Sequence, residues 1–226
     1  NLGWRSIFWF MLLFGALSLL AVGFGLPETH DTRHEPPLRP GRILADYASL
    51  LASRAFLGYT LVGGFGFAGM FAYIANSPFV LIELHGVRPE SFGWFFGVVA
   101  FGYVAASQIN ARLLNVAPPT RLLRVAVRGP ALAGLLLVLG EALVGPSLPW
   151  VMAGFFVYVS SMGFIGPNAA AAALATHGQM AGKASALMGS LQFGLATLAG
   201  GLVGLWHDGG TRPLMVIMAL GGIGAW

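Results

Sequence analysis

The chain of 226 residues carries 12 Lys and Arg, 8 Asp and Glu, a net charge of +4 and 57% hydrophobic residues. So few charges cannot make the surface of a domain of this size polar, which excludes a soluble globular protein. The basic excess is too small to follow a phosphate backbone, so we expect no nucleic-acid partner. The absence of cysteine excludes disulfides and thiolate chemistry.

Apolar stretches with few charges recur along the chain, each long enough to cross a bilayer. A membrane helix needs about 20 apolar residues. We therefore predict an all-α polytopic membrane protein with seven spans. They are residues 4–26, 54–77, 91–111, 122–144, 148–173, 183–206 and a truncated 212–226.

The long connection 27–53 separates the first span from the other six. Its first part, 27–41, is rich in Pro and charge and should be irregular. Its second part has an apolar face at helical spacing and predicts an amphipathic helix on the inner membrane face. The residues of that face are Ile43, Leu44, Tyr47, Leu50 and Leu51. Nine of the twelve Lys and Arg fall on this linker's side, which should be cytoplasmic.

This arrangement predicts two helix bundles joined by a linker. Residues 1–26 would be the last helix of the N-terminal bundle, 27–53 the cytoplasmic linker, and 54–226 a nearly complete C-terminal six-helix bundle. Because residue 1 is Asn and the chain stops inside an apolar run, we expect a fragment.

The glycines Gly64, Gly66 and Gly69 fit the spacing G-x-G-x-x-G of dinucleotide-binding loops. That motif binds a cofactor only between a strand and a helix, whereas here it lies inside a span. We interpret the glycines as contacts for a neighbouring helix. No catalytic motif occurs, and the histidines lie in or beside loops. We therefore expect no enzyme, no cofactor and no metal site.

Polar and aromatic residues share one face in each of four spans. The candidate substrate-binding residues are Tyr59, Met70 and Tyr73 in the second span, Tyr103 in the third, Tyr158 and Asn168 in the fifth, and Ser185 and Gln192 in the sixth. Each could instead form an interhelical hydrogen bond, worth about 0.6–2 kcal/mol. Stripes on four helices favour a central cavity.

Two further features concern the interior of the spans. We expect Gly163, Gly166 and Pro167 to interrupt and kink the fifth span, as in transport sites formed by broken helices; the alternative is a kink that serves packing alone. Glu141 is the only acid within a span and lies near its outer end, so we interpret it as interfacial. No acid lies at mid-depth, so a coupling proton should bind outside this fragment.

Five groups of residues, taken in order, are similar to one transporter family. They are Gly3-Trp4-Arg5-Ser6-Ile7-Phe8-Trp9 with Leu26-Pro27-Glu28-Thr29, Gly66-Phe67-Ala68-Gly69-Met70-Phe71 with Ser77-Pro78-Phe79-Val80, Phe92-Gly93-Trp94 with Asn110-Ala111-Arg112, Pro167-Asn168-Ala169, and Ala184-Ser185-Ala186-Leu187 with Gln192-Phe193-Gly194. The chain resembles the drug:proton antiporters of the major facilitator superfamily, in the bicyclomycin and chloramphenicol resistance subfamily. The loop after Arg112 lacks the Asp and Gly of that superfamily's gating motif.

The resemblance implies helices six to twelve of a twelve-helix exporter of the bacterial inner membrane, in which helices seven, eight, ten and eleven face the cavity. It would export bulky, weakly polar drugs in exchange for protons by alternating access. We expect drugs, protons and the lipid bilayer as its partners and a monomer when complete. Open alternatives are a metabolite transporter, for a sugar for example, a membrane scaffold and an intramembrane enzyme.

Overall fold

The computed structural model describes residues 3–25, 40–145, 147–206 and 208–226, in two compact units, 1–40 and 41–226. The first unit holds the helix α1, Arg5–Gly25, which buries none of its residues. It is long and apolar enough to span a membrane, which agrees with the predicted first span.

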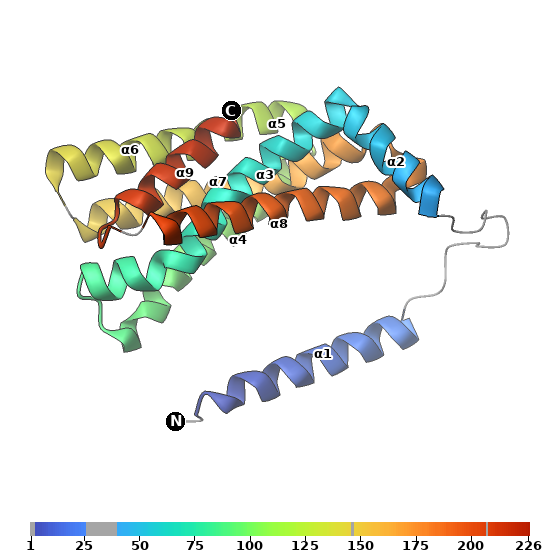
Figure 1. The fold of residues 1–226 in the computed structure, drawn as a ribbon. Coiled ribbons are helices and arrows are strands. Elements are labelled where there is room, and N and C mark those ends of the chain that lie inside the picture. The colour runs from blue at the N-terminus through green and yellow to red at the C-terminus, as the bar shows by residue number, and fades with distance from the viewer. Residues whose placement is uncertain (1–2, 26–39, 146, 207) are drawn as a thin grey trace. The chain divides into compact units, whose positions relative to one another are not determined.

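The second unit is a bundle of helices joined by short loops (Figure 1). Its helices are α2 (Pro40–Ala52), α3 (Arg54–Pro78), α4 (Pro89–Leu113), α5 (Pro119–Ala126), α6 (Arg128–Val144), α7 (Leu148–Leu174), α8 (Ala181–Leu205) and α9 (Arg212–Gly224). By length and composition, α3, α4, the pair α5–α6, α7 and α8 can each cross a membrane, whereas α9 is shorter. The predicted spans are confirmed to that extent, and the described residues form no strand.

The core of this unit lies around α3 and α7. Helix α3 contacts α7, α8 and α9, and α7 also contacts α4, α5 and α6. The predicted packing role of the glycines is confirmed: a Cβ on Gly64 would lie 2.8 Å from the side chain of Leu195, and one on Gly66 would lie 2.8 Å from that of Met162. Small residues let helices approach closely in a membrane protein, where they pack without a hydrophobic driving force.

The end of α3 differs from the predicted boundary at residue 77. The chain stays helical through Pro78 and continues as a π-helical segment, Phe79–Leu84. The helix extends past the approximate end predicted for this span because a proline removes only one backbone donor, and a wider helical turn can satisfy the neighbouring groups. The segment closes with the N–H of Val87 donating to the carbonyl oxygen of Leu81 over 2.9 Å.

The predicted amphipathic helix is α2, and its apolar face packs on the bundle. Leu50 is fully buried in a cluster with Phe56, Ala173 and Ala184, which links α2 to α3, α7 and α8. Asp46 forms a salt bridge of 2.6 Å with Lys183 at the start of α8. Leu44 stays exposed. The predicted irregular part of the linker lies almost wholly outside the described residues.

Candidate functional site

The amide of Gln192 lies where three helices meet. A Cβ on Gly63 of α3 would lie 2.9 Å from Nε2 of Gln192 and 3.5 Å from Cβ of Ala169 in α7. Because glycine has no side chain, the long Gln192 side chain of α8 fits against the α3 backbone. This places a polar amide among apolar helices, where a hydrogen-bonding group is expensive without a partner.

A pair of amides joins α4 and α7 at a similar height in the bundle. Nδ2 of Asn168 donates a hydrogen bond of 2.6 Å to Oδ1 of Asn110, and both side chains are buried. The Asn168 oxygen Oδ1 has no further partner among the described residues. Asn168 precedes Ala169, the residue that neighbours Gly63. Asn110, Asn168 and Gln192 therefore lie at a similar height in the bundle, on α4, α7 and α8, and these three residues are here called the amide layer.

Aromatic rings pack closer to the π-helical end of α3. Tyr73 stacks on Phe96 of α4 with the ring centroids 5.8 Å apart, and it lies 4.7 Å from Phe155 of α7. Tyr73 is 1% exposed, and its hydroxyl has no partner among the residues that the structure describes. Ten residues of helix separate it from Gly63, or about 15 Å along the axis. Tyr73 thus lies well away from the amide layer.

A second aromatic group lies on the surface of α3 and α8, and sequence reasoning missed it. Phe193 meets Phe67 edge to face at 5.2 Å and Phe71 at 6.4 Å. Phe193 is 58% exposed, so its ring is accessible. The signal was available, because Phe67 and Phe71 are one turn apart and Phe193 directly follows Gln192. These rings can offer apolar area beside the amide layer.

The other candidate residues are spread over the bundle. Tyr158 is fully buried, and its hydroxyl donates to the carbonyl oxygen of Gly66 over 3.4 Å, which ties α7 to α3. Tyr59 is half-buried next to the α2 contact, and Met70 is half-buried against the core. Tyr103 and Ser185 are exposed. The structure therefore brings Asn168 and Gln192 into one layer and does not bring all eight candidates together.

The predicted interruption of the fifth span is wrong. Helix α7 is continuous through Gly163, Gly166 and Pro167, because one missing backbone donor does not end a helix that its neighbours support. A Cβ on Gly163 would lie 2.6 Å from the carbonyl oxygen of Tyr103, so this glycine lets α4 cross closely. Gly166 faces open space. A kink at Pro167 stays a prediction.

The charged groups are consistent with this interior being uncharged. Glu83, Glu90 and Asp208 are exposed at helix ends, and Glu141 lies three residues before the end of α6. Within the described ranges no three His, Asp or Glu side chains come together as a metal site would need. Among the described residues the buried polar side chains are therefore amides and hydroxyls.

Comparison with known proteins gives consistent matches. The sequence profile of the Major Facilitator Superfamily matches residues 1–201. The chain is 33% identical over 216 residues to the bicyclomycin resistance protein homolog of Haemophilus influenzae, covering 95% of this chain and 54% of that protein. It is 32% identical over 215 residues to an uncharacterized MFS-type transporter of Bacillus subtilis, covering 95% and 53%.

A third relative is the multidrug transporter MdfA of Yersinia pestis, which is 28% identical over 197 residues, covering 86% of this chain and 47% of that protein. The chain thus spans about half the length of the curated relatives that it matches.

Proposed function

The chain belongs to the Major Facilitator Superfamily, and on this premise we propose that it forms part of a drug exporter. It is a multi-pass protein of the bacterial inner membrane, and its family supports transport rather than enzymatic chemistry. In the proposed arrangement α1 is the last helix of one bundle, and residues 54–226 are the six helices of the other. The complete exporter would act as a monomer.

The observation that carries this proposal is the amide layer. Asn110, Asn168 and Gln192 are the hydrogen-bonding groups of one layer, and they come from α4, α7 and α8 around α3. Sites for bulky apolar ligands combine much apolar and aromatic area with a few polar groups that orient the ligand. The names of two relatives, a bicyclomycin resistance protein homolog and a multidrug transporter, support drugs as the substrate class.

The charge pattern disfavours the rival function, a transporter of sugars or sugar phosphates. The sequence has no Asp, Glu, Lys or Arg in residues 55–82, 91–111, 148–182 or 184–206, which make up most of α3, α4, α7 and α8. An anionic or strongly hydrated ligand needs charged or multiple hydrogen-bonding partners once it leaves water.

The proposed mechanism is alternating access driven by proton exchange. Rocking of two bundles would expose a midplane site to each side in turn. A coupling group must be protonated and released at mid-depth, and the acids after residue 54, namely Glu83, Glu90, Glu141 and Asp208, lie at helix ends or in loops. We therefore assign the coupling proton to a group that this chain does not supply, and the α2 side of the membrane to the cytoplasm.

The test replaces Gln192 by Leu in the complete transporter and measures the drug resistance of cells against a panel of compounds. Gln192→Leu should change the relative resistance to different drugs severalfold, because it removes one orienting amide and keeps the volume. Thr197→Val is the matched control on α8, since the Thr197 hydroxyl donates to Phe193 of its own helix and is exposed. An unchanged drug profile for Gln192→Leu, with normal protein levels, would contradict the proposal.

A further inference from the structure

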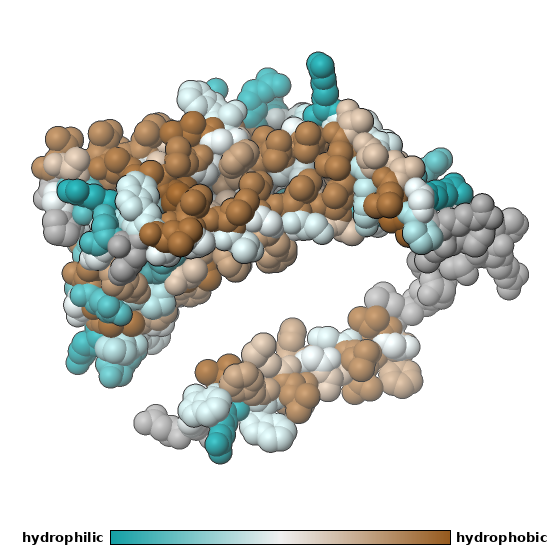
Figure 2. Space-filling view, viewed as in Figure 1, coloured by the Kyte–Doolittle hydropathy of each residue, from teal (hydrophilic) through white to brown (hydrophobic). Residues whose placement is uncertain are grey.

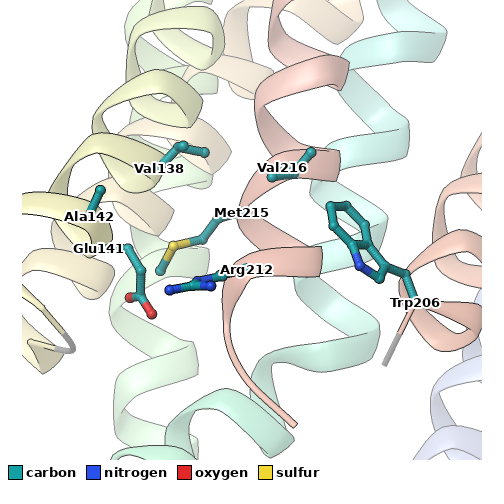
Figure 3. Close-up of a pocket in the computed structure, with 7 residues that line it drawn as sticks. All are labelled: Val138, Glu141, Ala142, Trp206, Arg212, Met215 and Val216. Atoms are coloured by element: carbon teal, nitrogen blue, oxygen red, sulfur yellow. The ribbon is translucent and has the colours of Figure 1, made fainter. Parts of the chain in front are cut away.

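A small pocket lies at the end of α6 and the beginning of α9, away from the amide layer (Figure 3). Its volume is about 220 Å³, which is less than the about 300–1,000 Å³ of pockets for drug-sized ligands. Glu141 of α6 and Arg212 of α9 line it, together with Trp206 from the end of α8. The pocket thus combines one acidic, one basic and one aromatic side chain.

The Glu141 carboxylate is fixed by a hydrogen bond but has no basic partner among the described residues. The hydroxyl of Thr211 donates a hydrogen bond of 2.7 Å to Oε1 of Glu141, which fixes the carboxylate. The second oxygen, Oε2, is buried and has no partner among the described residues. A buried carboxylate oxygen without a donor costs free energy, so a cationic or N–H donor is favoured at this place.

The basic side of the pocket is also unpaired. Figure 3 shows the Glu141 carboxylate and the Arg212 guanidinium both extending below Met215 into the pocket. In the described part of the chain, however, Lys183 forms a salt bridge with Asp46, and Arg212 has no acidic partner within salt-bridge distance. A guanidinium binds phosphate through parallel N–H donors. A ligand with one cationic and one phosphate group would satisfy both side chains.

The depth of the lining residues orients such a ligand. Glu141 and Ala142 lie near the end of α6, whereas Val138 is one turn deeper in the bundle. Arg212 begins α9, whereas Met215 and Val216 lie one turn deeper. The charges are therefore at the membrane interface and the apolar wall extends towards the bilayer interior. This is the arrangement of a phospholipid, with its headgroup outside and its acyl chains inside.

The surface around the pocket is suited to lipid. Helix α6 exposes an apolar stripe of five residues: Leu132, Leu135, Leu136, Leu139 and Leu143. Helix α8 exposes Leu198, Leu202 and Leu205 in the last turns before Trp206. Figure 2 shows hydrophobic surface along this unit and hydrophilic residues towards its ends. Tryptophan is enriched at membrane interfaces, where one part of the ring is apolar and the other meets water.

We propose that this pocket binds the headgroup of a zwitterionic phospholipid with a primary amine, such as phosphatidylethanolamine. The ammonium group donates to the Glu141 carboxylate, and the phosphate accepts from the Arg212 guanidinium. The acyl chains follow Val138, Met215 and Val216. A trimethylated amine has no N–H to donate to Glu141, and an anionic headgroup would be repelled by the negative charge of the Glu141 carboxylate. The site therefore distinguishes headgroups by their chemistry, independently of the transported drug.

The experiment uses the full-length transporter in detergent with equal amounts of phosphatidylethanolamine, phosphatidylcholine and phosphatidylglycerol of identical acyl chains. Native mass spectrometry measures which lipid stays bound. Phosphatidylethanolamine should be retained preferentially, and Glu141→Gln should reduce this preference on the order of tenfold, because a charge-assisted hydrogen bond is lost. Gln keeps an acceptor for Thr211. Arg212→Gln should weaken retention of phosphatidylethanolamine and phosphatidylcholine alike.

Two further variants make the test decisive. Glu90→Gln is the matched control, since Glu90 is an exposed acid in the first turn of α4, and it should leave the preference unchanged. Ala142→Phe keeps both charges and fills the pocket, so it should abolish retention while the melting temperature stays near that of the wild type. Equal retention of the three lipids by the wild type, or a preference that survives both Glu141→Gln and Ala142→Phe, overturns the proposal. A preference for phosphatidylglycerol that only Arg212→Gln removes overturns it too.

Discussion

Asn168 donates its side-chain amide to Asn110 across 2.6 Å, and this hydrogen bond joins α7 to α4 inside an apolar bundle. The two residues are 58 positions apart in the sequence, and both are buried. Because both side chains are buried, neither amide can form a hydrogen bond with water when its partner is removed. The pair therefore has a structural role in addition to its proposed place in the amide layer.

We expect Asn110→Ala and Asn168→Ala each to lower the free energy of unfolding by about 0.6–2 kcal/mol, the range for interhelical hydrogen bonds in membranes. The double variant should lose less stability than the sum of the two single losses, because each single variant already removes the one hydrogen bond that the two residues share. Thermal unfolding in detergent measures the stability of the wild type, the two single variants and the double variant. Strict additivity would show that the two amides do not act as a pair.

Gly163 and Gly166, two of the three glycines of α7, give a sharper test of helix packing. Gly163→Ala should destabilise the protein by about 1–3 kcal/mol, because its Cβ would lie 2.6 Å from the carbonyl oxygen of Tyr103 and 2.8 Å from the amide nitrogen of Ser107, both α4 backbone atoms. Gly166→Ala is the control three residues away, where a Cβ meets nothing within 4 Å. It should be neutral or slightly stabilising, because Ala favours helix. A loss of stability for Gly166→Ala equal to that for Gly163→Ala would contradict this account.

The attachment of α2 should depend more on its apolar face than on its salt bridge. Leu50 is fully buried, so Leu50→Ala should cost about 2–5 kcal/mol. Asp46 and Lys183 are 22% and 35% exposed, so Asp46→Asn should cost only about 0–1 kcal/mol, and less at high salt. Thermal unfolding at two salt concentrations compares them. A larger effect of Asp46→Asn than of Leu50→Ala would reverse this ranking.

The proposed orientation can be tested with single cysteines at Thr32 and Gly86 in the complete protein. Nine of the twelve Lys and Arg lie on the Thr32 side of the predicted spans, and positive loops remain cytoplasmic. A membrane-impermeant thiol reagent added to intact cells should therefore label the cysteine at position 86 alone. Labelling at position 32 instead would invert the orientation and the direction of transport.

The sequence by itself determined the features that depend on local composition. Runs of apolar residues predicted the spans, the spacing of Tyr47 and Leu50 predicted an amphipathic α2, and glycines inside a span indicated helix contacts. These succeed because the hydrophobic effect and helical periodicity act on neighbouring residues. Pro78 was the local exception, since the cost of a proline depends on what satisfies the backbone around it.

Only the tertiary structure decided which side chains meet. The same sequence signal marked Gly163 and Gly166, but only Gly163 faces another backbone. The stripes placed Tyr158 and Asn168 on one face as equal candidates, yet Tyr158 bonds to the α3 backbone at Gly66 whereas Asn168 bonds to Asn110 of α4. Nothing in the sequence joins Glu141 to Thr211 across 70 residues. These contacts depend on the rotation and crossing of each helix, and those are set by close packing summed over the whole bundle rather than by any one segment.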